Sequence, residues 1–248
     1  MNGRVICGLQ PVREAIRTHG AKLARVMVVE VKSVEVSPQL EALARFAQDH
    51  GARVDRLPRS ELDRAARGVH HQGAIAFAPE LEVTALHELA LDDRSLVVAL
   101  DEIQDPQNFG AIIRSAVAMS ATAVVWPEHR SAPLSPATFR ASAGAIEHAT
   151  LCRVSSLPPA LDALRERGLF VVGLDLTGPT SIDQIDLARP VALVVGAEGK
   201  GLRKTVKRTC DALASLPMPG PIGSLNASVA VAIALYECVR QRGPRPAP

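Results

Sequence analysis

Three segments in the second half of this chain combine glycines with polar side chains where an apolar stretch meets a helical pattern. They cover residues 108–114, 196–201 and 216–228. In open sheets of parallel strands, ligands bind beyond the carboxyl ends of the strands, so loops far apart in sequence can line one crevice. The three segments therefore predict one shared ligand site.

The first segment places Asn108 at the start of a helical pattern and Arg114 one turn into it. Asn108 alone is explained most simply as the N-cap, because asparagine is among the best capping residues. Arg114 lies among apolar neighbours near the positive end of the helix dipole, where a cation is disfavoured. We therefore expect its guanidinium to meet an anion or a partner carboxylate.

The second segment, Gly196-Ala197-Glu198-Gly199-Lys200-Gly201, follows an apolar strand pattern. Its glycines permit left-handed backbone angles and close approach of a ligand to the main chain. The segment has neither the ending of a Walker A loop nor the spacing G-x-G-x-x-G, which disfavours phosphate cradling of ATP or NAD. Glu198, taken alone, is as readily explained as a surface acid.

The third segment begins with a loop of leucine, prolines, methionine and glycine over residues 216–220. Such a loop offers apolar surface and free main-chain amides, which suit an adenine ring. Ser224 and Asn226 can cap the helix that follows. The alanines of that helix let another helix approach closely.

Length and composition limit the class of protein. The chain has 248 residues, 47% of them apolar and 22% charged, which suffices for one large domain or two smaller ones. No apolar run approaches the roughly 20 residues of a membrane span, and no secretory pattern opens the chain, so we expect a cytoplasmic protein. The four cysteines lie far apart without metal-ligand spacing, so we expect no metal.

A net charge of +2 does not by itself indicate a nucleic-acid partner, because local clustering of charge decides. A basic cluster follows the glycine segment and consists of Arg203, Lys204, Lys207 and Arg208. The simpler explanation of such a cluster is a solvated helix face. Because only 3% of the residues are aromatic, we expect any RNA to be held through phosphates and shape more than through stacking.

Two α/β regions are expected to position these residues. Alternating patterns over residues 1–78 predict a small α/β domain. Its helices are predicted at residues 10–18, 37–50 and 60–67, and its strands at 25–30, 53–57 and 74–78. Residues 79–94 lack a strong period and are interpreted as a linker with a short helix.

The larger α/β region covers residues 95–248. Near-continuous apolar strands separated by helical stretches are typical of a parallel sheet covered on both faces. These strands are predicted at residues 96–100, 123–126, 169–174, 191–195 and 212–216, and a last helix at 226–240. The proline-rich tail after Gly243 is expected to fray.

Taken together, the motifs resemble those of a known family. They read Asn108-x-Gly110-x-x-x-Arg114, Val194-Val195-Gly196-Ala197-Glu198-Gly199-x-Gly201 and Pro217-Met218-x-Gly220-x-x-x-Ser224-Leu225-Asn226-x-Ser228-x-Ala230. In order and spacing this combination resembles the SpoU/TrmH class of RNA 2'-O-ribose methyltransferases, of the SPOUT superfamily, over residues 95–242. Ile6-Cys7-Gly8 and His71-Gln72-Gly73 resemble the RNA substrate-binding domain of the same proteins. The chain is most similar to members that methylate a guanosine of 23S rRNA.

This resemblance implies a fold and a set of partners. It implies a trefoil-knotted methyltransferase domain over residues 95–248, preceded by a small RNA-binding domain over residues 1–78. It also implies a homodimer whose site is completed across the interface, RNA as the partner and S-adenosylmethionine as the methyl donor, without a metal. Three positions depart from the usual family residues, namely Gln107, Leu216 and Ala227.

The resemblance also implies the site residues. The residues implied to bind the cofactor are Gly196, Leu216, Met218, Gly220, Leu225 and Asn226. The residues implied in catalysis are Asn108, Arg114, Glu198, Ser224 and Asn226. The family pattern gives Arg114 a base-like role, but a guanidinium is a poor proton acceptor. Two roles therefore stay open for it, a base in a special microstate or a cation that clamps a phosphate and stabilises the developing alkoxide.

Three alternative functions remain at this stage. The first is the same methyl transfer to tRNA, which the motifs do not distinguish from transfer to rRNA. The second is a non-catalytic RNA-binding assembly factor, which the presence of every polar motif residue disfavours. The third is a nucleotide-dependent oxidoreductase, which the missing dinucleotide fingerprint disfavours.

Overall fold

The structure is a computed structural model that describes residues 3–30 and 37–243, so the tail that we expect to fray lies outside the described residues. The chain divides into two compact units. The N-terminal unit holds the described part of residues 1–82 together with residues 134–148, and the C-terminal unit holds residues 83–133 and the described part of 149–248.

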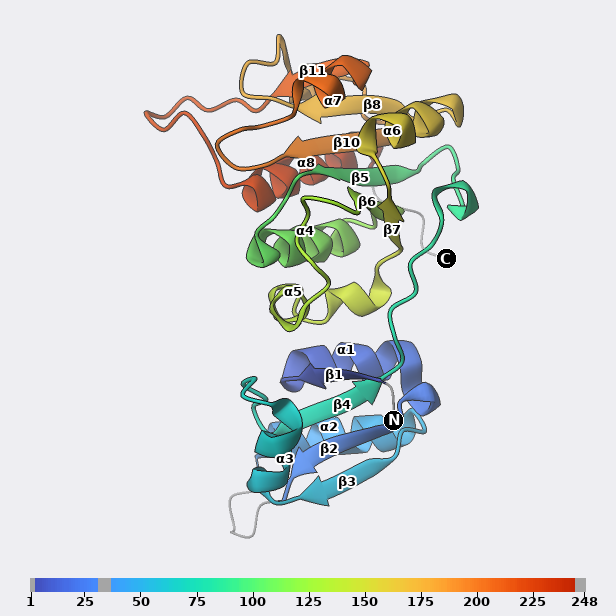
Figure 1. The fold of residues 1–248 in the computed structure, drawn as a ribbon, viewed down its shortest axis with the longest axis vertical. Coiled ribbons are helices and arrows are strands. Elements are labelled where there is room, and N and C mark those ends of the chain that lie inside the picture. Colours follow the sequence, from blue (N-terminus) through green and yellow to red (C-terminus); the bar gives the residue numbers. More distant parts are fainter. Residues whose placement is uncertain (1–2, 31–36, 244–248) are drawn as a thin grey trace. The chain divides into compact units, whose positions relative to one another are not determined.

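A four-stranded mixed sheet with the order β1-β4-β2-β3 forms the centre of the N-terminal unit (Figure 1). Its strands are β1 (Arg4–Cys7), β2 (Arg25–Val29), β3 (Val54–Leu57) and β4 (Ala74–Ala78). Its first three helices are α1 (Leu9–His19), α2 (Pro38–Asp49) and α3 (Arg59–Ala66). Every helix and strand predicted in this region is confirmed, whereas the four-residue strand β1 was not predicted.

The alternation of side chains along the strands explains how these helices cover the sheet. Val26 and Val28 of β2 pack in the cluster that contains apolar residues of α1 and α2. Met27, between them, packs instead with Leu62 and Ala66 of α3. Successive side chains of a strand point to opposite faces, so α1 and α2 cover one face and α3 the other.

Seven strands, all paired in parallel, form the sheet of the C-terminal unit in the order β7-β6-β5-β10-β8-β11-β9. They are β5 (Leu96–Asp101), β6 (Ala123–Pro127), β7 (Leu151–Val154), β8 (Phe170–Leu174), β9 (Thr180–Ser181), β10 (Val191–Gly196) and β11 (Ala212–Ser215). The helices are α4 (Pro106–Ala118), α6 (Leu157–Glu166), α7 (Lys204–Thr209) and α8 (Ala227–Arg242). The predicted parallel sheet is confirmed, and only the short strands β7 and β9 were not predicted.

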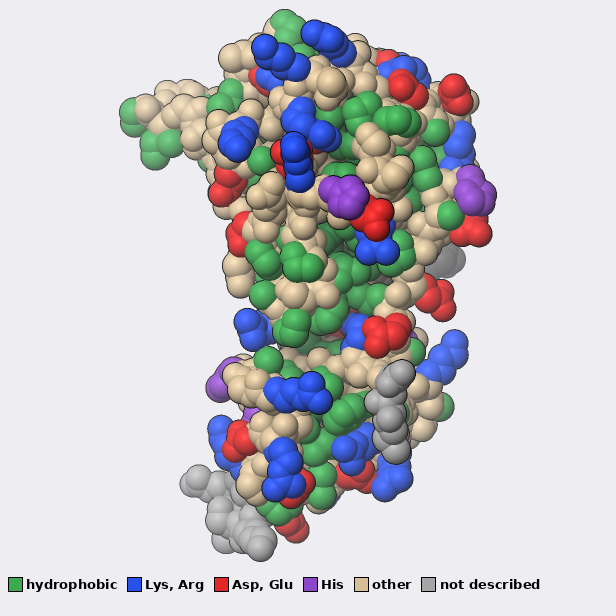
Figure 2. Space-filling model, viewed as in Figure 1, with side chains coloured by type: hydrophobic (Ala, Val, Ile, Leu, Met, Phe, Trp, Pro, Cys, Tyr) green, Lys and Arg blue, Asp and Glu red, His purple; other side chains and the backbone are tan. Residues whose placement is uncertain are grey.

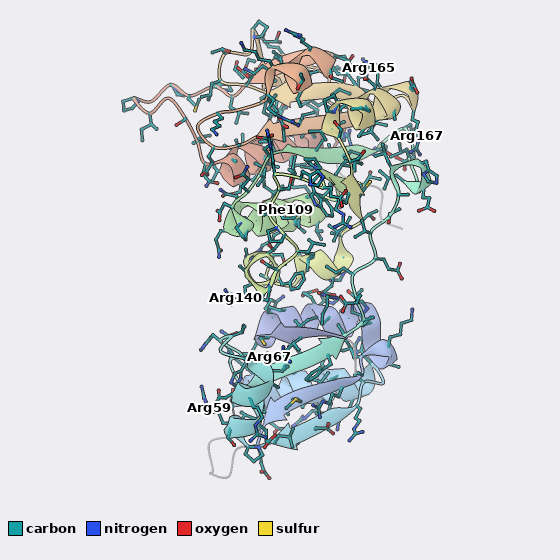
Figure 3. The ribbon with its side chains drawn as sticks, in the orientation of Figure 1. Arg59, Arg67, Phe109, Arg140, Arg165 and Arg167 are labelled. Atoms are coloured by element: carbon teal, nitrogen blue, oxygen red, sulfur yellow. The ribbon has the colours of Figure 1, made fainter. Side chains whose placement is uncertain are left out.

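Helices cover both faces of this sheet, as the uninterrupted apolar strands predict. Val125 of β6 packs in the cluster that contains residues of α6 and α7. The neighbouring Trp126 points to the other face, where its ring centroid lies 5.4 Å from that of Phe109 on α4, which is labelled in Figure 3. Helix α8 packs against both α4 and β10. The start of α8 is thereby brought close to the start of α4.

Residues 134–148 return to the N-terminal unit, although they follow β6 in the chain. They contain α5 (Pro136–Ala141) and a 3₁₀ helix, Ala145–His148. The two terminal guanidinium nitrogens of Arg4 donate to the carboxylate of Glu147, at 2.9 and 2.7 Å, and Nε2 of His19 lies 2.8 Å from the same carboxylate. Gly144 lies so close to α1 that a Cβ there would be 2.8 Å from Cα of Pro11. A buried ion pair and close backbone packing therefore hold this segment in place.

The described residues contain neither a membrane-spanning helix nor a cluster of metal ligands. No helix in them is both long and apolar enough to cross a membrane. They also contain no group of three or more histidine, cysteine, aspartate or glutamate side chains that could hold a metal ion.

Candidate active site

A cavity of about 500 Å³ opens at the carboxyl ends of β8, β10 and β11, which is where ligands bind in parallel sheets. Its walls come from the segments that follow these three strands and from the start of α8. Much of the lining is aliphatic, and the polar groups stand at a few positions. They are Asp175, Thr177, Glu198, Lys200, Lys207, Ser224 and Asn226.

The glycine segment after β10 forms a tight backbone wall of this cavity. The amide of Gly201 donates to the carbonyl of Ala197 at 2.8 Å, and Gly199 and Gly201 have φ angles of 72° and 63°. A Cβ on Gly196 would lie 2.1 Å from the carbonyl carbon of Gly201. Only glycine fits at residue 196, and the predicted left-handed backbone angles are confirmed at Gly199 and Gly201.

Asn226 joins the three sequence segments through hydrogen bonds. Its Nδ2 donates to Oδ1 of Asn108 at 2.8 Å and to Oε1 of Glu198 at 2.5 Å. Its Oδ1 accepts from the amides of Ser228 and Val229, so the same side chain caps α8. The amide of Asn226 is thus fully used, with donors toward the site and the acceptor toward the helix.

The N-cap of α4 is Asp105, so the simpler explanation of Asn108 as a capping residue is wrong. The carboxylate of Asp105 accepts from the amides of Gln107 and Asn108. Asn108 therefore lies inside the first turn, where its buried side chain is free to accept from Asn226.

Two ion pairs support the segments around the cavity. Asp101, at the end of β5, is almost fully buried and accepts from both the amide and Nε of Arg203, at 2.8 and 2.7 Å. Asp175 pairs with Lys207. Burial acts to raise the pKa of Asp175, but hydrogen bonds from Lys207 and Thr177 outweigh it, and the pKa lies below its usual 3.8. Two members of the predicted basic cluster are therefore internal partners of acids.

The structure brings most of the expected site residues together. The residues of the expected set that line the cavity are Gly196, Glu198, Leu216, Met218, Ser224, Leu225 and Asn226. Asn108 joins them through Asn226. Gly220 does not line the cavity and belongs to the loop between β11 and α8, which extends away from the sheet (Figure 1).

Among the residues expected in catalysis, Arg114 lies apart from the others. It is exposed on α4, does not line the cavity, and makes no side-chain hydrogen bond or ion pair with any described residue. Its neighbour Ser115 lines a shallow hollow with Ser228, Val229 and Tyr236 of α8. The expected anion or carboxylate partner is thus not supplied by the described part of its own chain.

Sequence reasoning missed Asp101, Asp175, Thr177 and Lys207. A usable signal was present, because Asp101 and Asp175 each directly follow a predicted apolar strand. Polar residues at the carboxyl ends of parallel strands are candidates for the site even without a motif.

Two family models match the chain. Residues 95–236 match the SpoU rRNA Methylase family, and residues 5–84 match the family described as RNA 2'-O ribose methyltransferase substrate binding. The first match alone covers more than half of the chain.

Relatives and solved structures agree with these matches. The chain is 40% identical over 243 residues to an uncharacterized tRNA/rRNA methyltransferase of Mycolicibacterium vanbaalenii, covering 96% of this chain and 76% of that protein. It resembles the S-adenosylmethionine complex of the SpoU methyltransferase AviRb from Streptomyces viridochromogenes with a TM-score of 0.77 and 27% identity, covering 97% and 90% of the two chains. An rRNA methyltransferase of Sinorhizobium meliloti with bound S-adenosylmethionine gives a TM-score of 0.75 and 27% identity, covering 95% and 86%.

These matches remove the oxidoreductase alternative and establish S-adenosylmethionine as the methyl donor. The chain belongs to the SpoU family of RNA 2'-O-ribose methyltransferases.

Proposed function

We propose that this RNA 2'-O-ribose methyltransferase acts on a guanosine of 23S rRNA. The observation that carries methyl transfer to a ribose is the hydrogen-bonded set of Asn108, Glu198 and Asn226 beside the cavity, because it presents polar groups where a ribose must approach the methyl donor. The choice of a guanosine in 23S rRNA rests on the family resemblance of the motifs. The matched substrate-binding model and the sizeable N-terminal unit favour a large structured RNA. Because that RNA is ribosomal, we expect the protein to work in the cytoplasm.

The cavity fits S-adenosylmethionine in size and chemistry. Its volume of about 500 Å³ lies in the range of small-molecule sites. Aliphatic surface for an adenine ring comes from Leu216, Met218 and Leu225, and no side chain at Gly196 covers the backbone there. The carboxylates of Asp175 and Glu198 suit the positive charge of the ligand. S-adenosylmethionine supplies an electrophilic methyl group on a sulfonium sulfur.

We assign the work of the chain to alignment and charge stabilisation. Glu198 orients the ribose, and Asn226, whose amide is held by Asn108, fixes the carboxylate of Glu198. Such alignment contributes on the order of 7–11 kcal/mol in favourable cases. A bond forms between the 2'-oxygen and the methyl carbon as the carbon–sulfur bond breaks, and the hydroxyl proton leaves to water. Arg114 stays cationic, holds an RNA phosphate and stabilises the developing alkoxide.

We further propose a homodimer in which Arg114 serves the cavity of the opposite subunit. Arg114 lies outside the cavity of its own chain, and its neighbour Ser115 lines a hollow together with exposed apolar residues on one face of α8. The exposed side chains on that face are Val229, Ile233 and Tyr236, which are 45%, 41% and 59% exposed and follow helical spacing. A second copy that covers this face would bury the apolar side chains and bring in a guanidinium. The family resemblance also leads us to propose the trefoil knot in the C-terminal unit.

One assay tests the proposed substrate. The protein is incubated with labelled S-adenosylmethionine and either unmodified 23S rRNA or unmodified tRNA, and the labelled nucleotide is mapped. We expect a 2'-O-methylguanosine in 23S rRNA alone. Label in tRNA alone would select the alternative that the relatives' names leave open. Label on a base would overturn the assignment of the site.

A further inference from the structure

A second cavity, of about 350 Å³, lies within the N-terminal unit and is separate from the methyl-donor cavity. Its walls come from β1, from the end of α3 and from residues 136–147. Residues 136–147 belong to the part of the sequence that matches the methyltransferase family, yet they complete a cavity on the unit that contains the substrate-binding match. Neither the family models nor the names of the relatives assign anything to this cavity.

Two unpaired cations stand on the wall of this cavity, Arg67 and Arg140. Both side chains are exposed, and neither makes an ion pair or a side-chain hydrogen bond with any described residue. Figure 3 labels Arg140 beside α5 and Arg67 lower in the view, and Figure 2 shows Lys and Arg side chains, in blue, on the visible face of the N-terminal unit. Two such cations beside one hollow provide a charge that only an anionic ligand would neutralise.

The backbone at Arg67 supports a role for its side chain. Arg67 ends α3 in the left-handed region with a φ angle of 49°, and Gly68 follows it. Glycine adopts this conformation most readily, so an arginine is uncommon at such a position. The side chain of Arg67 leaves the backbone at the end of α3, where it lines the cavity.

The rest of the cavity is apolar or internally neutralised. Val5, Val69, Phe139 and Ile146 contribute apolar surface. The third arginine of the lining, Arg4, is already paired with Glu147. Burial raises the pKa of the Cys7 thiol, and the positive charge of Arg140 offsets part of this rise. The charge of Arg140 therefore acts on a group in the apolar wall of the cavity.

We propose that this cavity is a nucleotide subsite for the RNA substrate, in which an unpaired nucleoside enters the apolar hollow and its phosphates contact Arg67 and Arg140. The volume is in the range of small-molecule sites, and an extruded base needs an apolar pocket with cations at its phosphates. The subsite rests on the proposed function for its ligand, since RNA is the anionic polymer that this unit must hold. It deepens that function by placing part of RNA recognition outside the methyl-donor cavity.

The test compares three variants of the full chain with the wild type. Arg67→Ala/Arg140→Ala removes both cations, and Ala65→Phe fills the cavity without changing charge, because Ala65 lines it. Arg45→Ala/Lys22→Ala is the matched control, since it removes two exposed cations of the same unit that do not line the cavity. The readouts are the Kd for unmodified 23S rRNA at two salt concentrations, KM and kcat for that RNA, and the Kd for S-adenosylmethionine.

We expect the double arginine variant to bind RNA about tenfold more weakly, with a salt slope smaller by about 1–2. Its KM for RNA should rise in parallel, while kcat at saturating RNA and the Kd for S-adenosylmethionine stay within about twofold of wild type. Ala65→Phe should weaken RNA binding without changing the salt slope. The control should leave all these values within about twofold.

The outcomes separate this proposal from the proposed function. If the wild type methylates 23S rRNA and the double arginine variant keeps the Kd and KM of the control, the subsite is wrong and the methyl transfer stands. If the wild type methylates no 23S rRNA but the double arginine variant still loses RNA affinity, the subsite stands and the assigned substrate falls.

Discussion

Nδ2 of Asn226 donates to Oδ1 of Asn108 across 118 positions of sequence, at 2.8 Å. The same nitrogen reaches Glu198, and the oxygen of the same amide caps α8. One side chain therefore couples the start of two helices to the glycine segment. Geometry at the proposed ribose site and stability of the last helix depend on a single residue.

Asn226→Ser separates these two roles, because serine is also a good N-cap but has no amide nitrogen. We expect the free energy of unfolding to change by less than about 0.5 kcal/mol. The rate of methyl transfer should fall at least about tenfold, because the variant loses the hydrogen bond to the carboxylate of Glu198, and a hydrogen bond to a charged group stabilises a site by about that much. Urea denaturation and initial rates measure the two effects. Equal rates for Asn226→Ser and wild type would remove Asn226 from the site.

Arg114→Ala tests whether the guanidinium charge of Arg114 stabilises the developing alkoxide. We expect turnover to fall by about 10²–10³-fold, as on removal of a group that stabilises a developing oxyanion, with the Kd for S-adenosylmethionine within about twofold. Arg114→Lys should recover part of the rate without a new pH dependence, since it keeps the cation. A rate that rises with pH only in the lysine variant would instead favour the role of a base.

The proposed dimer leads to a complementation experiment. Arg114→Ala and Asn226→Ser chains are each expected to be nearly inactive, but their mixture forms hybrid dimers with one intact site. Activity should recover to about a quarter of wild type on random exchange in a symmetric dimer. Ile233→Asp, on the exposed face of α8, should give monomers in sedimentation and abolish the recovery. No recovery in a verified hybrid would place Arg114 and Asn226 at the same subunit's site.

Gly196→Ala tests the tight backbone wall. Its Cβ would fall within 2.4 Å of three backbone atoms of Gly201 and Leu202, so the glycine segment must move. We expect binding of S-adenosylmethionine to be lost in calorimetry. Gly223→Ala is the control, because a Cβ at Gly223 meets no atom within 4 Å. Normal binding by Gly196→Ala would show that the wall is not needed.

The fold and the site differ in how far the sequence predicts them. Long apolar strands such as residues 191–195 have a clear pattern, and each was found within two residues of its observed bounds. Strand β9 has two residues and carries no period at all. The return of residues 134–148 to the first unit depends on the pairing of Arg4 with Glu147, a contact between residues far apart that no local pattern encodes.

At the site, the motifs identified the residues but not their connections. Asparagine at residue 108 is a good capping residue by type, yet Asp105 takes the cap because its carboxylate reaches two free amides. Arg203 was counted with a basic surface cluster, but the buried carboxylate of Asp101 holds it. Asp105 followed by Pro106 is a helix start that the sequence does contain. The pairing of Arg203 with Asp101, 102 positions apart, is revealed only by the folded chain.

The pairing of Arg4 with Glu147 also predicts a pH dependence. Burial acts to raise the pKa of Glu147, but Arg4 and His19 outweigh it, so the pKa lies below 4.5. A depressed pKa stabilises the fold above the unfolded value, and this stabilisation is lost as the pH falls through the folded value. Glu147→Gln leaves Arg4 buried and should cost about 3–5 kcal/mol at neutral pH. In urea titrations the cost should shrink below pH 4.5, whereas a constant cost down to pH 3 would contradict the pairing.

Because residues 134–148 belong to the first unit, recombination between related genes cannot exchange that unit as one continuous piece. The polypeptide passes between the two units three times, so neither unit is one continuous stretch of gene. A single recombination near residue 84 that imported another N-terminal half would leave the resident Glu147 and Gly144 facing a foreign α1 and β1. Functional chimeras should therefore require two exchanged pieces, and the RNA-binding half should be inherited together with this short stretch of the catalytic half.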